Sequence, residues 1–409
     1  MTEKMENWAR YCCLSMLVCL SFTTAGANFS LVAFLVCAIF SKKWQTNFHL
    51  IWKNPVAQAS VACFAMLFLS QFWADADSAL SWAWITKYKK LLIIPLVIPF
   101  FQNRQHKVVL IRTVFFSLLL GLLVSYSNFF GWTHIGDCPE IGCTAHTYIT
   151  LGVLNCLLFV TALVLRGQAT LSLEKWLFSG VALLAGLNVT LISLSRTAQV
   201  LLFMLMLILP FFISRSNDAD NQKKWWGVGG ALILVAFSMV AIGTLKSSRL
   251  LDSLERVAVY RMDAFKSTNN AVSVDVRFEF YRKAAALIAE KPLLGWGSGG
   301  HELKLLSMSE KGETDNERYV FSNPHNEYLS WTLQTGLIGL SFFLYWLYAV
   351  WRNAMRIERD DERLILQGWL LIFTLGCFLN SFLLDFSEGY MTVLLIAAFQ
   401  PSHPNREPQ

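Results

Sequence analysis

The sequence predicts an all-α, polytopic membrane protein with about 12 transmembrane helices and one large extramembrane loop. The chain of 409 residues is 55% hydrophobic and only 15% charged, and its mean hydropathy is +0.45. Apolar runs recur from one end of the chain to the other. The alternation of period two that a transmembrane barrel requires is absent.

The expected spans follow these runs in order, and the second, fourth and twelfth are short. The first run is expected to remain as a span, because no cleavable signal peptide is evident. The twelve ranges are 8–25, 28–41, 56–73, 84–101, 108–130, 147–165, 176–195, 197–214, 225–244, 327–351, 364–383 and 390–400.

One segment, between the ninth and tenth spans, is long enough to form its own structure. Within it, Ser273–Glu290 is expected to be a helix that ends at Lys291-Pro292, followed by a flexible G-W-G-S-G-G turn. The expected organisation is therefore nine transmembrane helices over 1–244, a loop domain over 245–326, three further helices over 327–400, and a tail over 401–409.

Basic residues indicate the orientation of the chain. Most of those in short connections fall on the side of the N-terminus, which the positive-inside rule assigns to the cytoplasm. Both termini are therefore expected in the cytoplasm, and the net charge of +6 reflects this bias rather than a nucleic-acid partner. Four basic residues lie in short connections on the opposite side: Lys87, Lys89, Lys90 and Arg196.

Cys138 and Cys143 share an outward connection. In an oxidising compartment they could close a small disulfide loop. The sequence leaves open whether they do, and no catalytic role is expected for either.

Arg196 stands between two long apolar runs, Trp176–Ser195 and Thr197–Ser214. An arginine near bilayer depth costs several kcal/mol or more unless it lies in a watery cavity or has a partner. A guanidinium is well suited to bidentate binding of phosphate. This position therefore predicts an enzyme or carrier that handles a phosphorylated, membrane-associated substrate.

Lys87 and Lys90 are three residues apart, which places them on one face if that segment is helical. They are candidates for contacting the same anionic substrate. Snorkelling of each ammonium group at a helix end is an equally ordinary explanation.

His325 and Asn326 lie where the large loop re-enters the membrane, directly after Pro324. Histidine is the side chain whose unperturbed pKa suits proton transfer near neutral pH. The alternative is a helix-capping segment with a solvated histidine. Gly336 and Gly339 follow, although small residues are common in transmembrane helices.

These residues resemble the motifs of a known family, the O-antigen ligases. His325-Asn326, nine residues, Gly336, two residues and Gly339 are similar to its H-[N/S/Q]-x9-G-x-x-G/T/Y motif. Arg196 opens R-T-A-Q-V, which resembles the R-x3-L element, with Val200 where leucine is usual. The segment D-V-R-F-E-F-Y-R-K-A-A-A-L-I-A-E-K-P-L-L-G-W-G-S-G looks like a loop signature shared with related polymerases, in which the functional arginine falls on Arg277.

The resemblance implies transfer of a glycan from undecaprenyl diphosphate to a sugar hydroxyl of lipid A–core oligosaccharide, which completes lipopolysaccharide. The reaction would occur at the periplasmic face of a bacterial inner membrane, in a fold like that of other lipid-linked (GT-C) glycosyltransferases. It implies no metal, no ATP and no cofactor. The partners would be the lipid-linked donor, the lipid A–core acceptor and membrane lipids.

The side chains are compatible with that chemistry. A departing diphosphate needs a divalent metal or fixed cations, and Arg196 and Arg277 are the expected cations. His325 is the expected general base, and in-line attack on the anomeric carbon would invert its configuration. Expected substrate-binding residues are Asn326, Lys87, Lys90, Asp385 and Glu388.

Two acidic pairs have alternative interpretations. Asp385 and Glu388 precede the last span and could orient an arginine, bind the acceptor, serve as base, or belong to a solvated turn. Asp75 and Asp77 come closest to an Asp-x-Asp metal motif, and we interpret them as span-end polarity. No metal site is therefore expected.

Three other functions remain open at this point. An O-antigen polymerase would share the donor and the arginines but would use another lipid-linked repeat unit as acceptor. A protein O-oligosaccharyltransferase usually carries a further soluble C-terminal region. A secondary transporter would be expected to have internal repeats and charges near mid-membrane, and neither is found in the sequence.

Overall fold

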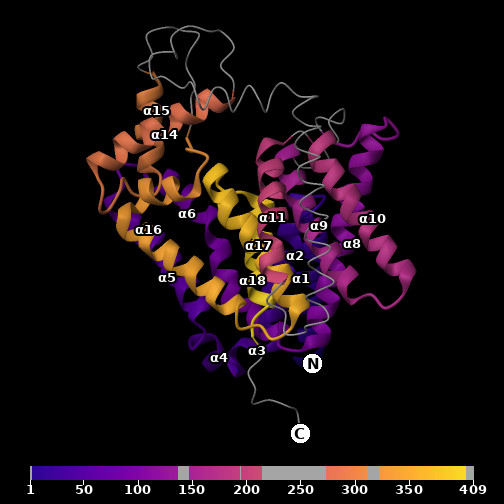
Figure 1. Cartoon of the computed structure of the whole chain (residues 1–409). Helices are drawn as coiled ribbons and strands as arrows, with labels where there is room; N and C mark the ends of the chain where they lie inside the picture. Colours follow the sequence, from indigo (N-terminus) through magenta and orange to yellow (C-terminus); the bar gives the residue numbers. More distant parts are fainter. Residues whose placement is uncertain (1, 137–146, 194, 214–272, 311–321, 402–409) are drawn as a thin grey trace.

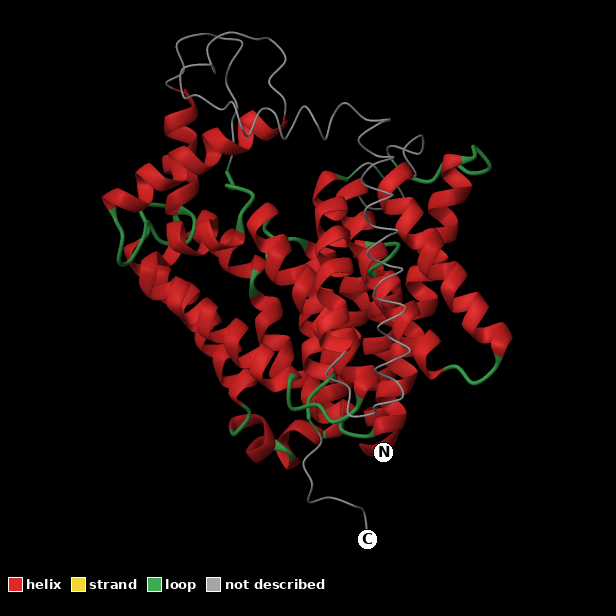
Figure 2. Ribbon diagram, viewed as in Figure 1, coloured by secondary structure: helices red, strands yellow, loops and turns green. Residues whose placement is uncertain are grey.

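The computed structural model describes residues 2–136, 147–193, 195–213, 273–310 and 322–401. Within these ranges the chain forms helices and no strands (Figures 1 and 2), in agreement with the all-α class. The expected ninth span, 225–244, lies outside the described residues, as do Cys138 and Cys143.

The helices follow the predicted order closely. Their bounds are α1 Thr2–Cys19, α2 Thr24–Ser41, α3 Lys43–Thr46, α4 Phe48–Trp52, α5 Pro55–Leu69, α6 Ser78–Lys87, α7 Ile93–Val97, α8 Arg104–Phe129, α9 Tyr148–Gln168, α10 Ser172–Leu187, α11 Arg196–Ile213, α14 Ser273–Glu290, α15 Gly300–Glu310, α16 Glu327–Ala354, α17 Asp360–Leu379 and α18 Phe386–Ala398. Short 3-10 turns cover Ser70–Trp73, Lys89–Leu92 and Ile98–Phe101, and a π-helical turn covers Asn188–Ile192.

Seven helices in the described part of the chain are long and apolar enough to cross a membrane. They are α2, α5 with its 3-10 extension, α8, α9, α10 with its π turn, α16 and α17. Two further apolar helices, α11 and α18, are shorter. A total of twelve spans therefore stays a prediction.

The expected span over 84–101 is not one continuous helix. This stretch consists of the end of α6, two 3-10 turns and the five-residue α7. Pro95 and Pro99 lie within it, and proline removes a helical hydrogen-bond donor and clashes with the preceding turn. The short pieces bring Tyr88 and Lys90 into the protein interior, where both are buried.

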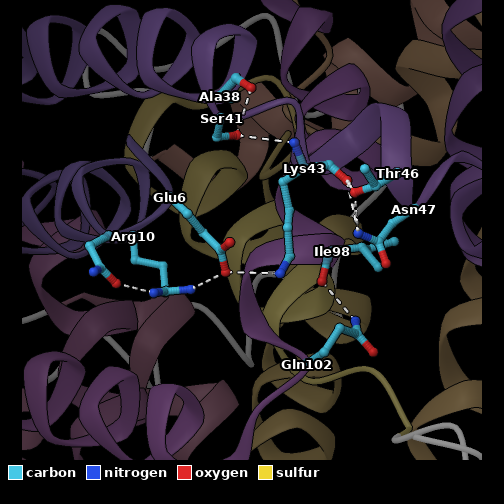
Figure 3. Close-up of polar contacts among 10 residues, drawn as sticks. Glu6, Arg10, Ala38, Ser41, Lys43, Thr46, Asn47, Ile98 and Gln102 are labelled. Atoms are coloured by element: carbon cyan, nitrogen blue, oxygen red, sulfur yellow. Dashed lines mark hydrogen bonds and ion pairs between the residues drawn. The ribbon is translucent and has the colours of Figure 1, made fainter. Parts of the chain in front are cut away.

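A polar cluster closes the end of the bundle at which α1 begins. Lys107 of α8 donates to Glu362 (2.9 Å) and to the carbonyl oxygen of Gln400 (2.7 Å). Near it, Glu6 lies between Arg10 and Lys43, with the Lys43 Nζ at 2.9 Å (Figure 3). The beginning of α1 and the end of the last helix thus share one end, while α14 and α15 lie at the other (Figure 1).

The loop helix predicted over Ser273–Glu290 is confirmed as α14. Its buried face presents Phe280, Ala284 and Leu287 to Trp296 and to Leu333 of α16, in a small apolar cluster separate from the main core. The G-W-G-S-G-G segment after α14 is not the loose turn that its glycines suggested, because residues 295–300 are all buried.

This buried segment inserts its main chain into a break in α16. In a regular helix the Leu337 and Ile338 N–H groups would donate to the carbonyls of Leu333 and Gln334. Here they donate instead to Pro292 (2.8 Å) and Leu293 (3.3 Å). The two released carbonyls accept from the N–H groups of residues 296 (2.8 Å) and 297 (2.9 Å). Each of these four backbone groups at the break is therefore paired.

Gly336 makes the break possible. Its φ of 65° and ψ of −167° lie in a region that residues with a Cβ rarely adopt. A Cβ at this position would lie only 2.1 Å from the Leu293 carbonyl oxygen. This glycine is thus required by a close backbone approach, and not only by packing between helices.

Replacing Gly336 by alanine is predicted to destabilise the protein. Backbone strain of this kind costs about 1–3 kcal/mol, and the overlap with Leu293 adds to it, so we expect a clearly lower Tm in detergent. Gly180→Ala is the matched control, because Gly180 lies in α10 and a Cβ added there would meet nothing within 4 Å, so its Tm should be unchanged or higher. Equal Tm values for the two variants would contradict this account of the break.

Candidate functional site

The predicted His-Asn pair lies at the outer end of α16 and is held by its neighbours. Asn326 caps α16: its Oδ1 accepts from the Leu329 N–H (3.0 Å), and its Nδ2 donates to the carbonyl of Phe378 in α17 (3.1 Å). The His325 backbone has a positive φ of 51°, and its N–H donates to Asn323 Oδ1 (3.1 Å). His325 is exposed, so an external group can reach it.

Glu327, the residue after the pair, fixes the connection between α17 and α18. Its Oε1 accepts from the Tyr88 hydroxyl (3.0 Å) and from Trp331 Nε1 (3.1 Å). Its Oε2 accepts from the backbone N–H groups of Leu383 (3.0 Å) and Leu384 (3.2 Å). Four donors thus satisfy a fully buried carboxyl group and hold residues 380–385 beside His325.

Asn380, in that connection, bridges His325 and Asp385. The His325 Nδ1 lies 3.1 Å from Asn380 Oδ1, and Asn380 Nδ2 donates to Asp385 Oδ2 at 2.8 Å. Asn380 was not among the residues predicted from the sequence. The only signal for it was a polar side chain near the end of the expected span 364–383.

Arg277 of α14 acts on His325 from the other side. Desolvation of the imidazole lowers the pKa of His325 below 6.5, the positive charge of Arg277 lowers it further, and the Asn380 hydrogen bond partly opposes both. One turn after Arg277, the ring of Phe280 stacks on His325 at a centroid distance of 6.0 Å. The structure therefore places the arginine selected by the loop signature within electrostatic range of the histidine.

The neighbouring Arg282 has a different environment. It pairs with Glu279 of the same helix at 2.6 and 2.8 Å. Arg277 therefore remains the arginine of α14 that we expect to serve the site.

The buried Lys90 lies close to two acidic residues, Asp385 and Glu388. Lys90 is only 3% exposed, and its Nζ donates to the carbonyls of Leu384 (3.2 Å) and Asp385 (2.6 Å). Burial, together with the nearby Glu388 and Glu327 carboxyl groups, raises the pKa of Asp385, while Lys90 opposes the rise. Glu388 is 1% exposed, and its Oε1 has no hydrogen-bond partner among the described residues.

Arg196 begins α11, four residues after the last residue of the π-helical turn, Ile192, and is half-buried. Its helix starts against the first turns of α9, where a Cβ on Gly152 would lie 2.6 Å from that of Ala198. Thr150, in the same part of α9, lies beside the Glu388 carboxyl group. These contacts place the start of α11 at the same end of the bundle as Asp385 and His325.

Lys87 belongs to a separate set of contacts. Its Nζ lies 4.0 Å from the centroid of the Trp84 ring, and Trp84 Nε1 donates to Glu302 of α15 at 2.6 Å. The acidic pair at the start of α6 also has protein partners: Asp77 accepts from the Leu80 N–H (2.7 Å), and Asp75 lies 3.4 Å from Lys291. The described residues contain no group of three His, Cys, Asp or Glu side chains arranged to hold a metal ion.

Comparison with known proteins agrees with this arrangement. Residues 180–344 match the O-antigen ligase family. This match and the relatives described below support the O-antigen ligase superfamily. The matched range contains Arg196, Arg277 and His325, and it includes the break of α16.

Two curated relatives are proteins of Rickettsia felis and Rickettsia conorii, each named a "Putative polysaccharide ligase". The first is 24% identical over 277 residues, which are 66% of this chain and 60% of the relative. The second is 23% identical over 228 residues, which are 54% of this chain and 51% of the relative. The aligned part of this chain thus spans between half and two thirds of the length of these relatives.

Glu327→Gln is predicted to weaken the fold at the site. The new amide would turn a donor toward either the Leu383 and Leu384 N–H groups or the Tyr88 hydroxyl, and each buried group left unpaired costs about 1–3 kcal/mol. We expect a lower Tm and faster amide hydrogen exchange in residues 380–385. The exposed Glu358→Gln is the control, and an unchanged Tm in both variants would show that Glu327 does not hold this connection.

Proposed function

We propose that this chain is an O-antigen ligase. It transfers a glycan from undecaprenyl diphosphate to a sugar hydroxyl of lipid A–core, at the periplasmic face of a bacterial inner membrane. The observation that carries the proposal is the placement of His325 at the start of α16, hydrogen-bonded to Asn380 (3.1 Å) and near enough to Arg277 for its charge to lower the pKa of the imidazole. The family match and the helices of transmembrane length support it.

The proposed reaction is a single displacement. The acceptor hydroxyl oxygen attacks the anomeric carbon while its proton passes to His325. The bond from that carbon to the diphosphate oxygen breaks, and undecaprenyl diphosphate leaves with the electron pair. Attack opposite the leaving group inverts the anomeric configuration.

The proposed roles of the other side chains follow from their contacts. Arg277, with Arg196, stabilises the charge that develops on the diphosphate, as fixed donors do in other transferases. Lys87, on the α6–α15 side, remains a candidate donor contact. We assign Asn326 and Lys90 to holding the site together, since Asn326 caps α16 and Lys90 is buried against main-chain carbonyls.

The two acidic residues, Asp385 and Glu388, are assigned different roles. Asp385 reaches His325 through Asn380, so we assign it to orienting the base. Glu388, whose Oε1 is without a hydrogen-bond partner among the described residues, remains the candidate for contacting the acceptor. Neither is required as a metal ligand in this proposal.

The direct test is reconstitution in liposomes with a purified lipid-linked glycan and lipid A–core, with and without a chelator. A ligase forms lipopolysaccharide under both conditions. Elongation of the lipid-linked glycan without transfer to lipid A–core would identify a polymerase instead. Loss of product only in the reaction that contains the chelator would show that a metal is required.

Arg196→Ala and Arg277→Ala are predicted to lower transfer at least a hundredfold, since removal of one such donor typically costs about 10²–10³ in rate. The variants should still insert into the membrane and remain folded in detergent. Arg282→Ala is the matched control from the same helix, because its guanidinium is paired with Glu279, and it should retain transfer. Wild-type transfer by either of the first two variants would refute the diphosphate role.

His325→Ala is predicted to reduce turnover by about 10²–10⁴, the usual contribution of a general base, with donor binding retained. The base acts when neutral, and its pKa lies below 6.5. Turnover of the wild type should therefore be constant near neutral pH and should fall only as the pH drops through a value below 6.5. His325 would be excluded as the base if the fall of turnover on the acid side of the pH profile (the acid limb) lay above pH 6.5. Unchanged turnover in the variant would exclude it as well.

A further inference from the structure

We propose that Asn380 is a positioning residue that fixes the tautomer and the orientation of the His325 imidazole. This inference rests on the proposed role of His325 as general base. It assigns a role to a residue in the connection between α17 and α18, outside the motifs that carry the family resemblance. The argument follows from the two hydrogen bonds of its side-chain amide.

The two partners of the Asn380 amide lie at opposite ends of it. An asparagine side chain offers one acceptor oxygen and one donor nitrogen. Its Nδ2 donates to Asp385 Oδ2 at 2.8 Å. The Oδ1 then faces His325 at 3.1 Å.

This orientation determines which imidazole nitrogen carries the proton. Asn380 Oδ1 can only accept, so the His325 Nδ1 must be the donor. A neutral imidazole with its proton on Nδ1 leaves the lone pair on Nε2. That lone pair is what a base needs in order to take a proton from an acceptor hydroxyl.

The position of Asn380 is itself held from several directions. It ends α17, where its N–H donates to the Gly376 carbonyl (2.8 Å). The next residue, Ser381, donates through its hydroxyl to Asn323 Oδ1 (2.9 Å). The same oxygen accepts from the His325 N–H, so side-chain and backbone bridges both join this connection to the histidine.

Without Asn380 the imidazole loses its acceptor at Nδ1. The ring can then rotate, and the tautomer with the proton on Nε2 becomes populated, which has no lone pair on Nε2 to take the proton of the acceptor hydroxyl. In serine proteases the wrong tautomer of the catalytic histidine lowers turnover by about 10⁴. His325 has Phe280 on one side to restrain its ring, so we expect a smaller loss of about ten- to a hundredfold.

A double-mutant cycle separates positioning from a merely structural effect. Asn380→Ala, His325→Ala and the double variant are reconstituted with purified lipid-linked glycan and lipid A–core. Asn380→Ala should lower the turnover number with little change in the donor KM, and it should cost nothing further when added to His325→Ala. Asn353→Ala is the matched control: it also loses an asparagine hydrogen bond, to Gln400 at the far end, and should keep full turnover.

A second measurement uses Asn380→Asp, in which the new side chain has nearly the same shape as asparagine and leaves no cavity. In Asn380→Asp the new carboxyl group lies against both Asp385 and Nδ1–H. The negative charge that the two carboxyl groups share stabilises the imidazolium, so the acid limb of turnover should move to higher pH. In Asn380→Ala the lost hydrogen bond should move it to lower pH. Arg277 of α14 lies near His325, Tyr281 of α14 lies beside Asn326, and Asp385 lies across Asn380; none of these three residues is substituted.

The positioning role would be supported if the acid limb moves in opposite directions in Asn380→Asp and Asn380→Ala, and if the losses of turnover in the double-mutant cycle are not additive. An equal loss from Asn380→Ala in the presence and absence of His325, or an acid limb that neither substitution moves, would overturn it. Full turnover of His325→Ala alone would instead refute the general base, and with it the proposed function. The failure of one proposal is thus distinguishable from the failure of the other.

Discussion

The structure depends on one constraint: backbone polar groups at membrane depth must find partners within the protein. α16 is interrupted at Gly336, and an unfilled interruption would leave two N–H groups and two carbonyls unpaired. Residues 292–297 supply all four partners. The loop that follows α14, the helix of Arg277, is therefore hydrogen-bonded to α16, which begins two residues after His325.

The same constraint explains why two sequence motifs that are far apart occur together. The loop signature ends in the glycine-rich segment that enters the break, and the His-Asn motif contains the glycine that opens it. Gly295 faces the break from the other side with a φ of 66°, and a Cβ added to it would lie 2.6 Å from the Leu333 carbonyl oxygen. The two motifs are two halves of one backbone contact, so a side chain in either half would displace the other.

Beneath this contact, buried polar groups determine the shape of the site. Glu327 holds the connection after α17, and Lys90 holds the start of α18. Asn380 and Asp385 project from that connection toward His325. The histidine is exposed, whereas Asn380 and Asp385 are half-buried.

The sequence alone determined the class of the protein, most helix positions and the helix over Ser273–Glu290, because hydropathy and motif spacing are local properties. It also singled out Arg196, Arg277 and His325 as candidates. It did not predict the breakup of 84–101, the burial of the glycine segment, or the bridge through Asn380. Those features depend on partners that are distant in the sequence, such as Tyr88 with Glu327 and Lys90 with Asp385. Only the tertiary structure brings such groups within hydrogen-bond distance, since no local pattern records which buried donor will meet which acceptor.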